Sequence, residues 1–283
     1  MRRSTPLVSP TVKALEQLDS WPAPRAAVAV VTPESVVAER GPADAFLRWA
    51  SVTKLLTSYA MLVAAEEGVL DLDDPCGPPG STVRHLLAHA SGLPFEGGTP
   101  IARPGERRIY SNTGFDLLGD LLGERAEMPF EDYLRAAVLE PLGLARVELR
   151  GRPSEGLWGT VRDLAAFGGE LLAPTLVAPE TLAEATAVAF PGLAGVLPGL
   201  GRQEPNDWGL GFELKDAKRP HWTGSANSPG TLGHFGGAGT FLWVDPEAQV
   251  ACACLTDLEF GEWALAAWPP LADAILAELG GVS

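Results

Sequence analysis

The sequence predicts an α+β fold, in which one antiparallel sheet is flanked by terminal helices and carries an inserted helical lobe. Strand-like segments occur near the start of the chain and again after Pro205, whereas helical periodicity fills the region between them. Apolar residues make up 46% of the 283 residues, enough for a sizeable core. We therefore expect a single unit over 1–283, with 1–50 and 205–283 in the sheet lobe and 51–204 in a mainly helical lobe.

A short helix and a hairpin are expected first. Thr11–Leu18 follows Ser9-Pro10, a pair typical of a helix N-cap and first turn. Ala26–Val31 and Ser35–Glu39 are short apolar runs joined at Pro33-Glu34, which favours two paired strands.

The middle of the chain has the pattern of helices separated by Gly/Pro turns. A long helix is expected from about Ser51 to Glu67, because apolar residues recur every three or four positions until Gly68. Shorter helices are expected at Val83–Ala88, Gly114–Ala126, Phe130–Leu139, Val161–Leu172 and Pro179–Ala187.

The last part of the chain returns to strands and ends in a helix. The Pro/Gly-rich stretch Pro191–Pro205 is expected to be a loop. Extended segments are expected at Trp208–Leu214, Thr231–Phe235, Thr240–Val244 and Val250–Leu255, followed by a helix over Trp263–Leu279.

Charge and composition exclude several kinds of partner. The net charge is −15, from 21 basic and 36 acidic residues, so we expect no nucleic-acid and no anionic-membrane partner. No run of about 20 apolar residues could span a membrane, and the start lacks the apolar core of a secretory signal. Cys76, Cys252 and Cys254 do not form a disulfide framework, so a cytoplasmic protein with reduced thiols is expected. Oligomeric state stays open.

Several familiar sites are missing. The sequence has no G-x-S-x-G nucleophile elbow, no Walker A loop and no G-x-G-x-x-G turn, so no cofactor is expected. His85 and His89 have the i, i+4 spacing of a zinc pair, but Leu86 stands where the usual motif carries glutamate. We therefore expect no metal and interpret both as ordinary helix histidines.

Ser51 and Lys54 form an S-x-x-K pair where the long helix is expected to begin. This spacing places both side chains on one helix face. The electropositive helix start favours negative charge, so the serine could lose its proton to a neighbour and its N–H could hold an oxyanion. Alone, the pair is equally compatible with a lysine on the helix surface.

Two further motifs carry candidate chemistry. Tyr110 and Asn112 form a rare Y-x-N pattern; cations near the tyrosine would lower the pKa of its phenol, and the phenolate could act as a general base. A buried tyrosine beside an asparagine N-cap is the alternative. His234 precedes Gly236 and Gly237 at the end of an expected strand, where a substrate could lie along the strand edge; a strand-end histidine before a flexible turn is the alternative.

Together, in this order, the three motifs resemble the serine β-lactamase and penicillin-binding protein-like family, specifically its class C-like branch of class C β-lactamases, D-alanyl-D-alanine carboxypeptidase and related esterases. The resemblance runs from about Arg25 to the end. Flanking segments are similar too: Trp49–Lys54, Leu86–Pro94, Pro104-Gly105, Tyr110–Gly114, Pro141–Leu144 and Gly233–Gly237.

The resemblance implies a β-lactamase/transpeptidase-like fold and a role for each site residue. Ser51 would be the acylated nucleophile, and Lys54 would either hold Tyr110 as phenolate or share the general-base work. Tyr110 would deprotonate Ser51, return the proton to the leaving group and then activate the hydrolytic water. Asn112 would bind the acyl-side amide of the substrate. His234, Gly236 and Gly237 would bind substrate from the strand, with the backbone N–H groups of Ser51 and Gly237 as the oxyanion hole.

Two departures from the family pattern bear on the substrate. His234 replaces the lysine of the usual K-T-G motif and is not a fixed cation at neutral pH, and Phe235 replaces the hydroxyl of the threonine. Both changes favour neutral esters or amides over penicillin-like acids. We expect a serine hydrolase acting on a small-molecule ester, amide or peptide, and turnover of β-lactams stays open. The alternative is a weak or silent member that binds a ligand or peptide in the same cleft.

Overall fold

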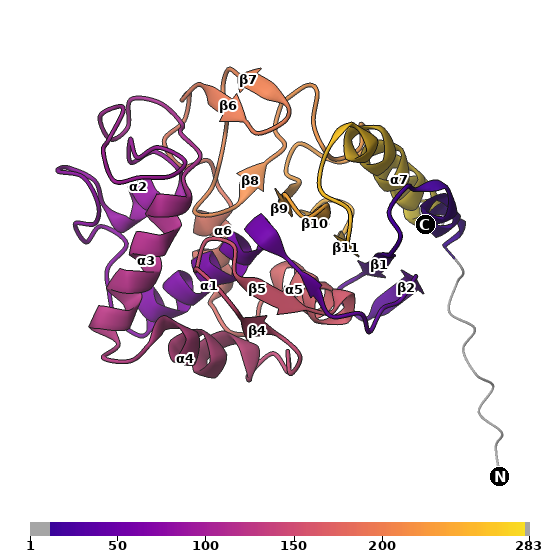
Figure 1. Ribbon diagram of the computed structural model, residues 1–283, viewed down its shortest axis with the longest axis horizontal. Coiled ribbons are helices and arrows are strands. Elements are labelled where there is room, and N and C mark those ends of the chain that lie inside the picture. Colours follow the sequence, from indigo (N-terminus) through magenta and orange to yellow (C-terminus); the bar gives the residue numbers. More distant parts are fainter. Residues whose placement is uncertain (1–11, 281–283) are drawn as a thin grey trace, which may run out of the picture.

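A six-stranded antiparallel sheet forms the centre of the computed structural model, which describes residues 12–280 (Figure 1). The strand order is β2-β1-β11-β10-β9-β8, so the early hairpin pairs with the late strands, as predicted. The strands are β1 (Ala26–Val31), β2 (Val36–Arg40), β8 (Glu213–Leu214), β9 (Leu232–Gly236), β10 (Thr240–Asp245) and β11 (Val250–Thr256).

Each face of the sheet packs against helices. The 3₁₀ helix η1 (Lys13–Ser20) and α7 (Glu262–Gly280) cover one face, where Cys252 and Cys254 pack as small apolar residues. The other face, which includes Ala251 and Ala253, packs against α5 (Val161–Leu172). The segment Ser9–Thr11, part of the predicted N-terminal helix, lies outside the described residues.

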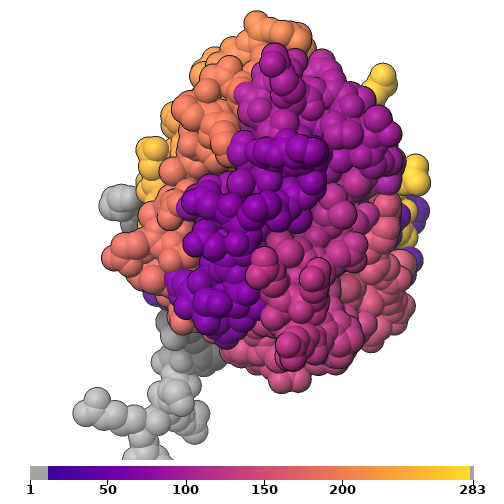
Figure 2. Space-filling model, turned by 90° about the vertical axis from the view of Figure 1, so that its left-hand side faces the viewer, coloured from indigo at the N-terminus to yellow at the C-terminus, as the bar shows by residue number. Residues whose placement is uncertain are grey.

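The remaining helices surround α1 (Thr53–Glu66), which is buried over nearly its whole length. A helix that is apolar on every side belongs in a core, which explains its central place in the lobe. Figure 2 shows that early, purple parts of this lobe share one surface with magenta and orange segments far along the sequence. The surrounding elements are α2 (Val83–Leu87), α3 (Asn112–Arg125), α4 (Phe130–Leu134), the π-helical turn η3 (Arg135–Leu139) and α6 (Pro179–Ala185).

Two predicted elements differ in detail. The long helix starts two residues later than expected, because Ser51 lies in a separate 3₁₀ turn, η2 (Ala50–Val52). The predicted strand Trp208–Leu214 is wrong for most of its length. Gly211 adopts a left-handed φ of +90° within the bend, and a Cβ there would lie 1.7 Å from Ser58 Oγ on α1.

Two small sheets have no counterpart in the predictions. The stretch Pro191–Pro205, expected to be a loop, contains a hairpin of two three-residue strands. Such short strands show no periodicity, so only tertiary pairing reveals them. The hairpin is β6 (Gly195–Leu197) with β7 (Gly201–Gln203), and the second small sheet joins β3 (Leu47–Arg48), β5 (Leu157–Gly159) and β4 (Glu148–Leu149).

No helix within residues 12–280 is long and apolar enough to cross a membrane.

Candidate active site

The turn that carries Ser51 is fixed against the end of β9 and β10. Ala50 has a φ of +49°, a left-handed conformation that costs energy for a residue with a Cβ. Thr240 Oγ1 donates to the Trp49 carbonyl at 2.8 Å, which ties this turn to β10. A Cβ at Gly236 would lie 2.6 Å from the Trp49 carbonyl oxygen, so the glycine permits the close approach of β9.

Lys54 lies fully buried one turn after Ser51. Its Nζ donates to Asn112 Oδ1 at 2.6 Å and to the Ser154 carbonyl at 2.8 Å. The ammonium also lies 4.8 Å from the centroid of the Tyr110 ring. Burial lowers the pKa of Lys54 to about 7, although the nearby Asp116 carboxylate opposes this shift. A substantial fraction of the amine is therefore unprotonated near neutral pH.

Tyr110 is packed between Lys54 and a group of rings. Its ring centroid lies 4.5 Å from that of His89 and 5.6 Å from that of His234. Burial raises the pKa of Tyr110, and a hydrogen-bonding interaction with the Ser51 side chain opposes the rise. The expectation of a lowered phenol pKa is therefore wrong, because desolvation outweighs the opposing interaction with Ser51. Within residues 12–280, no well-aligned hydrogen bond reaches the Tyr110 hydroxyl.

Asn112 is the first residue of α3, and its side chain is held at both ends. The N-cap is Ser111, whose Oγ accepts from the Gly114 N–H at 3.0 Å, so the interpretation of Asn112 as the N-cap is wrong. The Asn112 Oδ1 accepts from Lys54, and its Nδ2 donates to Glu96 Oε1 at 3.0 Å. The two partners leave one orientation of the amide, since an ammonium only donates and a carboxylate only accepts.

His234 lies on β9 and is uncharged. Its Nδ1 is 2.6 Å from the carbonyl oxygen of Phe235, which can only accept, so the ring proton is on Nδ1. Burial lowers the pKa of His234 to about 3, and the positive charge of Lys54 adds to the effect. Among the described residues, no hydrogen-bond partner reaches its Nε2.

A cavity of about 260 Å³ brings most of the predicted site residues together. Ser51, Tyr110, His234 and Gly237 all line it, while Lys54 and Asn112 lie behind Tyr110 and Gly236 lies beneath the Ser51 turn. The other lining residues are mainly apolar: Phe95, Leu197, Pro198, Gly199, Trp208, Glu213, Phe235 and Phe260.

Glu213, which also lines the cavity, was not predicted from the sequence. Its Oε1 accepts from Lys218 Nζ at 2.5 Å, and its Oε2 accepts from His221 Nε2 at 2.8 Å and Trp222 Nε1 at 2.9 Å. Burial raises the pKa of Glu213, but these partners outweigh it and the pKa falls to about 2. The carboxylate is therefore ionised, with both oxygens satisfied. No spacing in the sequence indicates these contacts.

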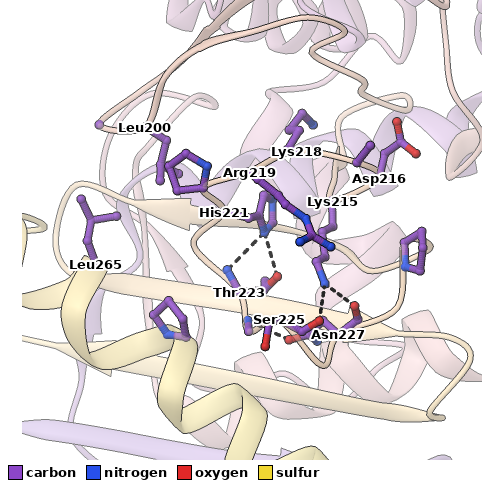
Figure 3. A pocket seen from close by; sticks show the side chains of 16 residues that line it. Leu200, Lys215, Asp216, Lys218, Arg219, His221, Thr223, Ser225, Asn227 and Leu265 are labelled. Atoms are coloured by element: carbon purple, nitrogen blue, oxygen red, sulfur yellow. Dashed lines mark hydrogen bonds between the residues drawn. The ribbon is translucent and has the colours of Figure 1, made fainter.

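On the far side of Lys218 and His221 lies a second, more open hollow of about 790 Å³ (Figure 3). The Lys215 side chain lines part of this hollow. Its amine donates to the carbonyls of Ser225 and Asn227 and so holds the loop that contains them. The hollow adjoins the smaller cavity lined by Ser51 at Gly199, which lines both.

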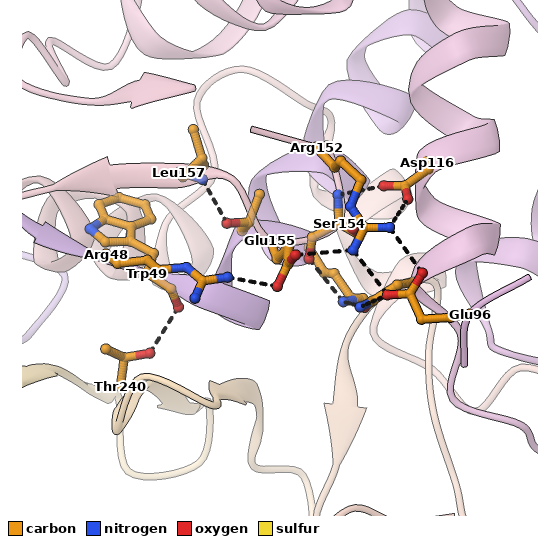
Figure 4. A network of polar contacts seen from close by, with 12 residues as sticks. Arg48, Trp49, Glu96, Asp116, Arg152, Ser154, Glu155, Leu157 and Thr240 are labelled. Carbon is orange, nitrogen blue, oxygen red and sulfur yellow. Dashed lines mark hydrogen bonds and ion pairs between the residues drawn. The ribbon is translucent and has the colours of Figure 1, made fainter. Parts of the chain in front are cut away.

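A network of charged groups supports the site from the lobe side (Figure 4). Arg152 donates to both oxygens of Glu96 at 2.9 Å, and also to Asp116 and Glu155 at 3.0 Å each. Hydrogen bonds with Arg152 are the main reason that the pKa of Glu96 falls to about 2. Glu96 in turn holds Asn112, so Arg152 reaches the Lys54 ammonium through two intermediate side chains.

The expectation that both histidines lie on one helix is wrong for His89: α2 ends at Leu87, and His89 follows it with a left-handed φ of +54°. His85 Nδ1 accepts from the Thr82 N–H at 3.3 Å and completes the N-terminal cap of α2. His89 is buried behind Tyr110, and its Nδ1 accepts from the Ser111 N–H at 3.1 Å. Within residues 12–280, no group of three or more His, Cys, Asp or Glu side chains is placed to hold a metal ion.

The chain is similar to known proteins both in sequence and in fold. A protein-family model described as Beta-lactamase matches residues 16–277. The D-alanyl-D-alanine-carboxypeptidase/endopeptidase AmpH of Escherichia coli K12 is 30% identical over 138 residues, covering 36% of each protein. Penicillin-binding protein 4* of Bacillus subtilis is 28% identical over 178 residues, which is 50% of this chain and 38% of that protein. The chain thus matches little more than a third of the length of these relatives.

Solved structures extend the similarity to nearly the whole chain. The crystal structure of a beta-lactamase from Mycobacterium bovis is 53% identical, with a TM-score of 0.93, and the match covers 94% of this chain and 99% of that one. The octameric penicillin-binding protein homologue from Pyrococcus abyssi shares the fold, with a TM-score of 0.74 at 23% identity over 94% of this chain and 76% of that one.

Proposed function

The chain belongs to the beta-lactamase family of serine hydrolases, and we propose that it hydrolyses an ester or amide through a covalent acyl-enzyme on Ser51. The observation that carries this proposal is the shared cavity of Ser51, Tyr110 and His234, with Lys54 directly behind the tyrosine ring. The cavity contains a hydroxyl nucleophile and a second hydroxyl that can relay a proton, and the buried Lys54 amine behind the second hydroxyl can accept that proton.

In the proposed acylation step, Ser51 Oγ attacks the carbonyl carbon of the substrate. The serine proton passes through the Tyr110 hydroxyl toward the unprotonated amine of Lys54. The backbone N–H groups of Ser51 and Gly237 stabilise the oxyanion, and each such donor typically contributes about 3 kcal/mol. The proton then returns to the leaving group as its bond to carbon breaks. A water molecule, deprotonated by the same pair, releases the acid and restores Ser51.

Lys54 is the better candidate for the ultimate base in this scheme. Its pKa of about 7 lies near neutral pH, where general-base catalysis is most effective. The pKa of Tyr110 is raised, so a resting phenolate is disfavoured. We therefore favour shared base work by Lys54 and Tyr110 over a tyrosine that is deprotonated before substrate binds.

Incubation with a chromogenic ester and with a chromogenic cephalosporin tests the function. Turnover of either by the wild type, together with its loss in Ser51→Ala, is the expected result. The variant should keep its circular-dichroism spectrum and urea midpoint, since a half-buried hydroxyl is replaced by hydrogen. Equal turnover in Ser51→Ala would remove the serine from its role.

A ligand-binding member that turns over little or no substrate is the second candidate. The raised pKa of Tyr110 favours it, because a phenol that keeps its proton is a poor base. Saturable binding of esters, D-amino acid amides or β-lactams without product and without a covalent adduct would support binding alone.

A further inference from the structure

We propose that His234 makes one wall of the catalytic cavity a hydrogen-bond acceptor, so that the cavity selects substrates bearing an O–H or N–H group and discriminates against carboxylates. The proposal rests on the proposed function, since it names the chemistry that the same cavity recognises. A lysine at this position of the strand would be a cation and a hydrogen-bond donor, whereas the proposed His234 is a neutral hydrogen-bond acceptor.

The acceptor character follows from the contacts of the ring. The Phe235 carbonyl oxygen lies 2.6 Å from Nδ1 and can only accept, so Nδ1 carries the hydrogen. The neutral ring then has a lone pair on Nε2. His234 is 3% exposed, and among residues 12–280 its Nε2 has no partner. A buried acceptor without a partner is costly, and a donor from a bound substrate would remove that cost.

The charges around the cavity work against an anionic substrate. Among the described residues that line it, none is a lysine or an arginine, and the one ordinarily charged member is the ionised Glu213. Lys218 and His221 are already paired with that carboxylate. The remaining nearby cation, Lys54, lies behind the Tyr110 ring and is engaged with Asn112 and Ser154. A carboxylate entering the cavity would lose its water without gaining a free cationic partner.

The other walls suit a flat apolar group that carries the donor. The Trp208 ring packs against His234 with centroids 5.5 Å apart, and the tilted rings of Phe235 and Phe260 lie 4.8 Å apart close by. Phe95, which is 54% exposed, stacks on Tyr110 at the mouth. Aromatic walls favour an aromatic or aliphatic body, while the single acceptor fixes its orientation.

Three acetate esters of nearly equal shape test the selectivity. Their leaving groups are 3-hydroxybenzamide, methyl 3-hydroxybenzoate and 3-hydroxybenzoate, which present a donor, no donor and a carboxylate. The wild type should show kcat/KM in the order amide, methyl ester, carboxylate, with about tenfold between the first two, as one hydrogen bond allows. A carboxylate used as well as the amide would overturn the proposal, even with all three hydrolysed through Ser51.

Substitution of His234 tests the residue itself. His234→Lys should raise kcat/KM for the carboxylate relative to the amide by about tenfold or more, because a donor and cation replace the acceptor. His85→Gln serves as the control, since His85 caps α2 away from the cavity, and it should leave the ratios unchanged. Unchanged ratios in a folded His234→Lys protein would contradict the proposal.

The tautomer of His234 can be measured by NMR in the absence of substrate. Nitrogen-15 NMR of the four histidines, with His234 identified by its loss in His234→Gln, should show a hydrogen on Nδ1 and none on Nε2. The His234 signals should stay constant from about pH 5 to about pH 8, since this ring is neutral throughout. A protonated Nε2, or titration within this range, would refute the inference whether or not the protein is an enzyme.

Discussion

Lys54→Met should remove a pH dependence of stability that the wild type possesses. Burial lowers the pKa of Lys54 to about 7 in the folded protein. In the unfolded chain a lysine has a pKa of about 10.4, so the unfolded state holds the proton more tightly. The wild type therefore gains stability as pH rises from about 7 to about 10.4, and loses it as pH falls through that window.

The size of the effect follows from the same two pKa values. Between about pH 6 and about pH 8, the free energy of unfolding of the wild type should rise relative to that of Lys54→Met by about 1.4 kcal/mol. By about pH 9 the relative gain should reach about 2.6 kcal/mol. The variant also leaves Asn112 Oδ1 and the Ser154 carbonyl without their donor, but that loss adds an offset that does not depend on pH.

Urea unfolding of both proteins at several pH values measures this difference. Lys13→Met is the matched control, because it makes the same substitution at an exposed lysine. Parallel pH curves for the wild type and Lys54→Met would refute the reasoning, because they would mean that Lys54 keeps its proton at neutral pH.

Four further outcomes are expected. The kcat/KM for a neutral ester should rise with pH through about 7 as Lys54 loses its proton, and a fall through that range would favour the phenolate alternative. Tyr110→Phe should lower kcat/KM by about 100-fold or more with the urea midpoint retained. Glu96→Ala should lower kcat more than Glu96→Gln, whose amide oxygen can still accept from Asn112; equal losses would argue against this contact. Gly211→Ala should lower the free energy of unfolding by about 2 kcal/mol, measured with urea, because its Cβ meets α1.

The local pattern of apolar residues was sufficient to predict the bounds of some longer helices and strands. The strand Ala26–Val31 and the helix Val161–Leu172 have the predicted bounds, because each has a run of apolar residues at the spacing of its own structure. The segment Trp208–Leu214 has an apolar residue at every second position, the spacing of a strand, yet Gly211 bends there to pass α1. That bend depends on a neighbour more than 150 positions earlier, so no local window contains it.

The sequence predicted those site residues that belong to short motifs. Ser51, Tyr110 and His234 were each identified by a motif, and the fold brings all three to one cavity. Glu96 and Arg152 were missed because their contacts join residues 56 positions apart, which no spacing rule connects. The raised pKa of Tyr110 was missed for another reason: burial sets it, and the sequence does not state how deeply a side chain is buried.

Intact-mass analysis after exposure to an activated ester tests the central claim most directly. The wild type, quenched in acid during turnover, should gain the mass of one acyl group, and peptide mapping should locate it on Ser51. Ser51→Ala should gain none. Hydrolysis that proceeds with the acyl group on another residue, or with full activity in Ser51→Ala, would contradict the account.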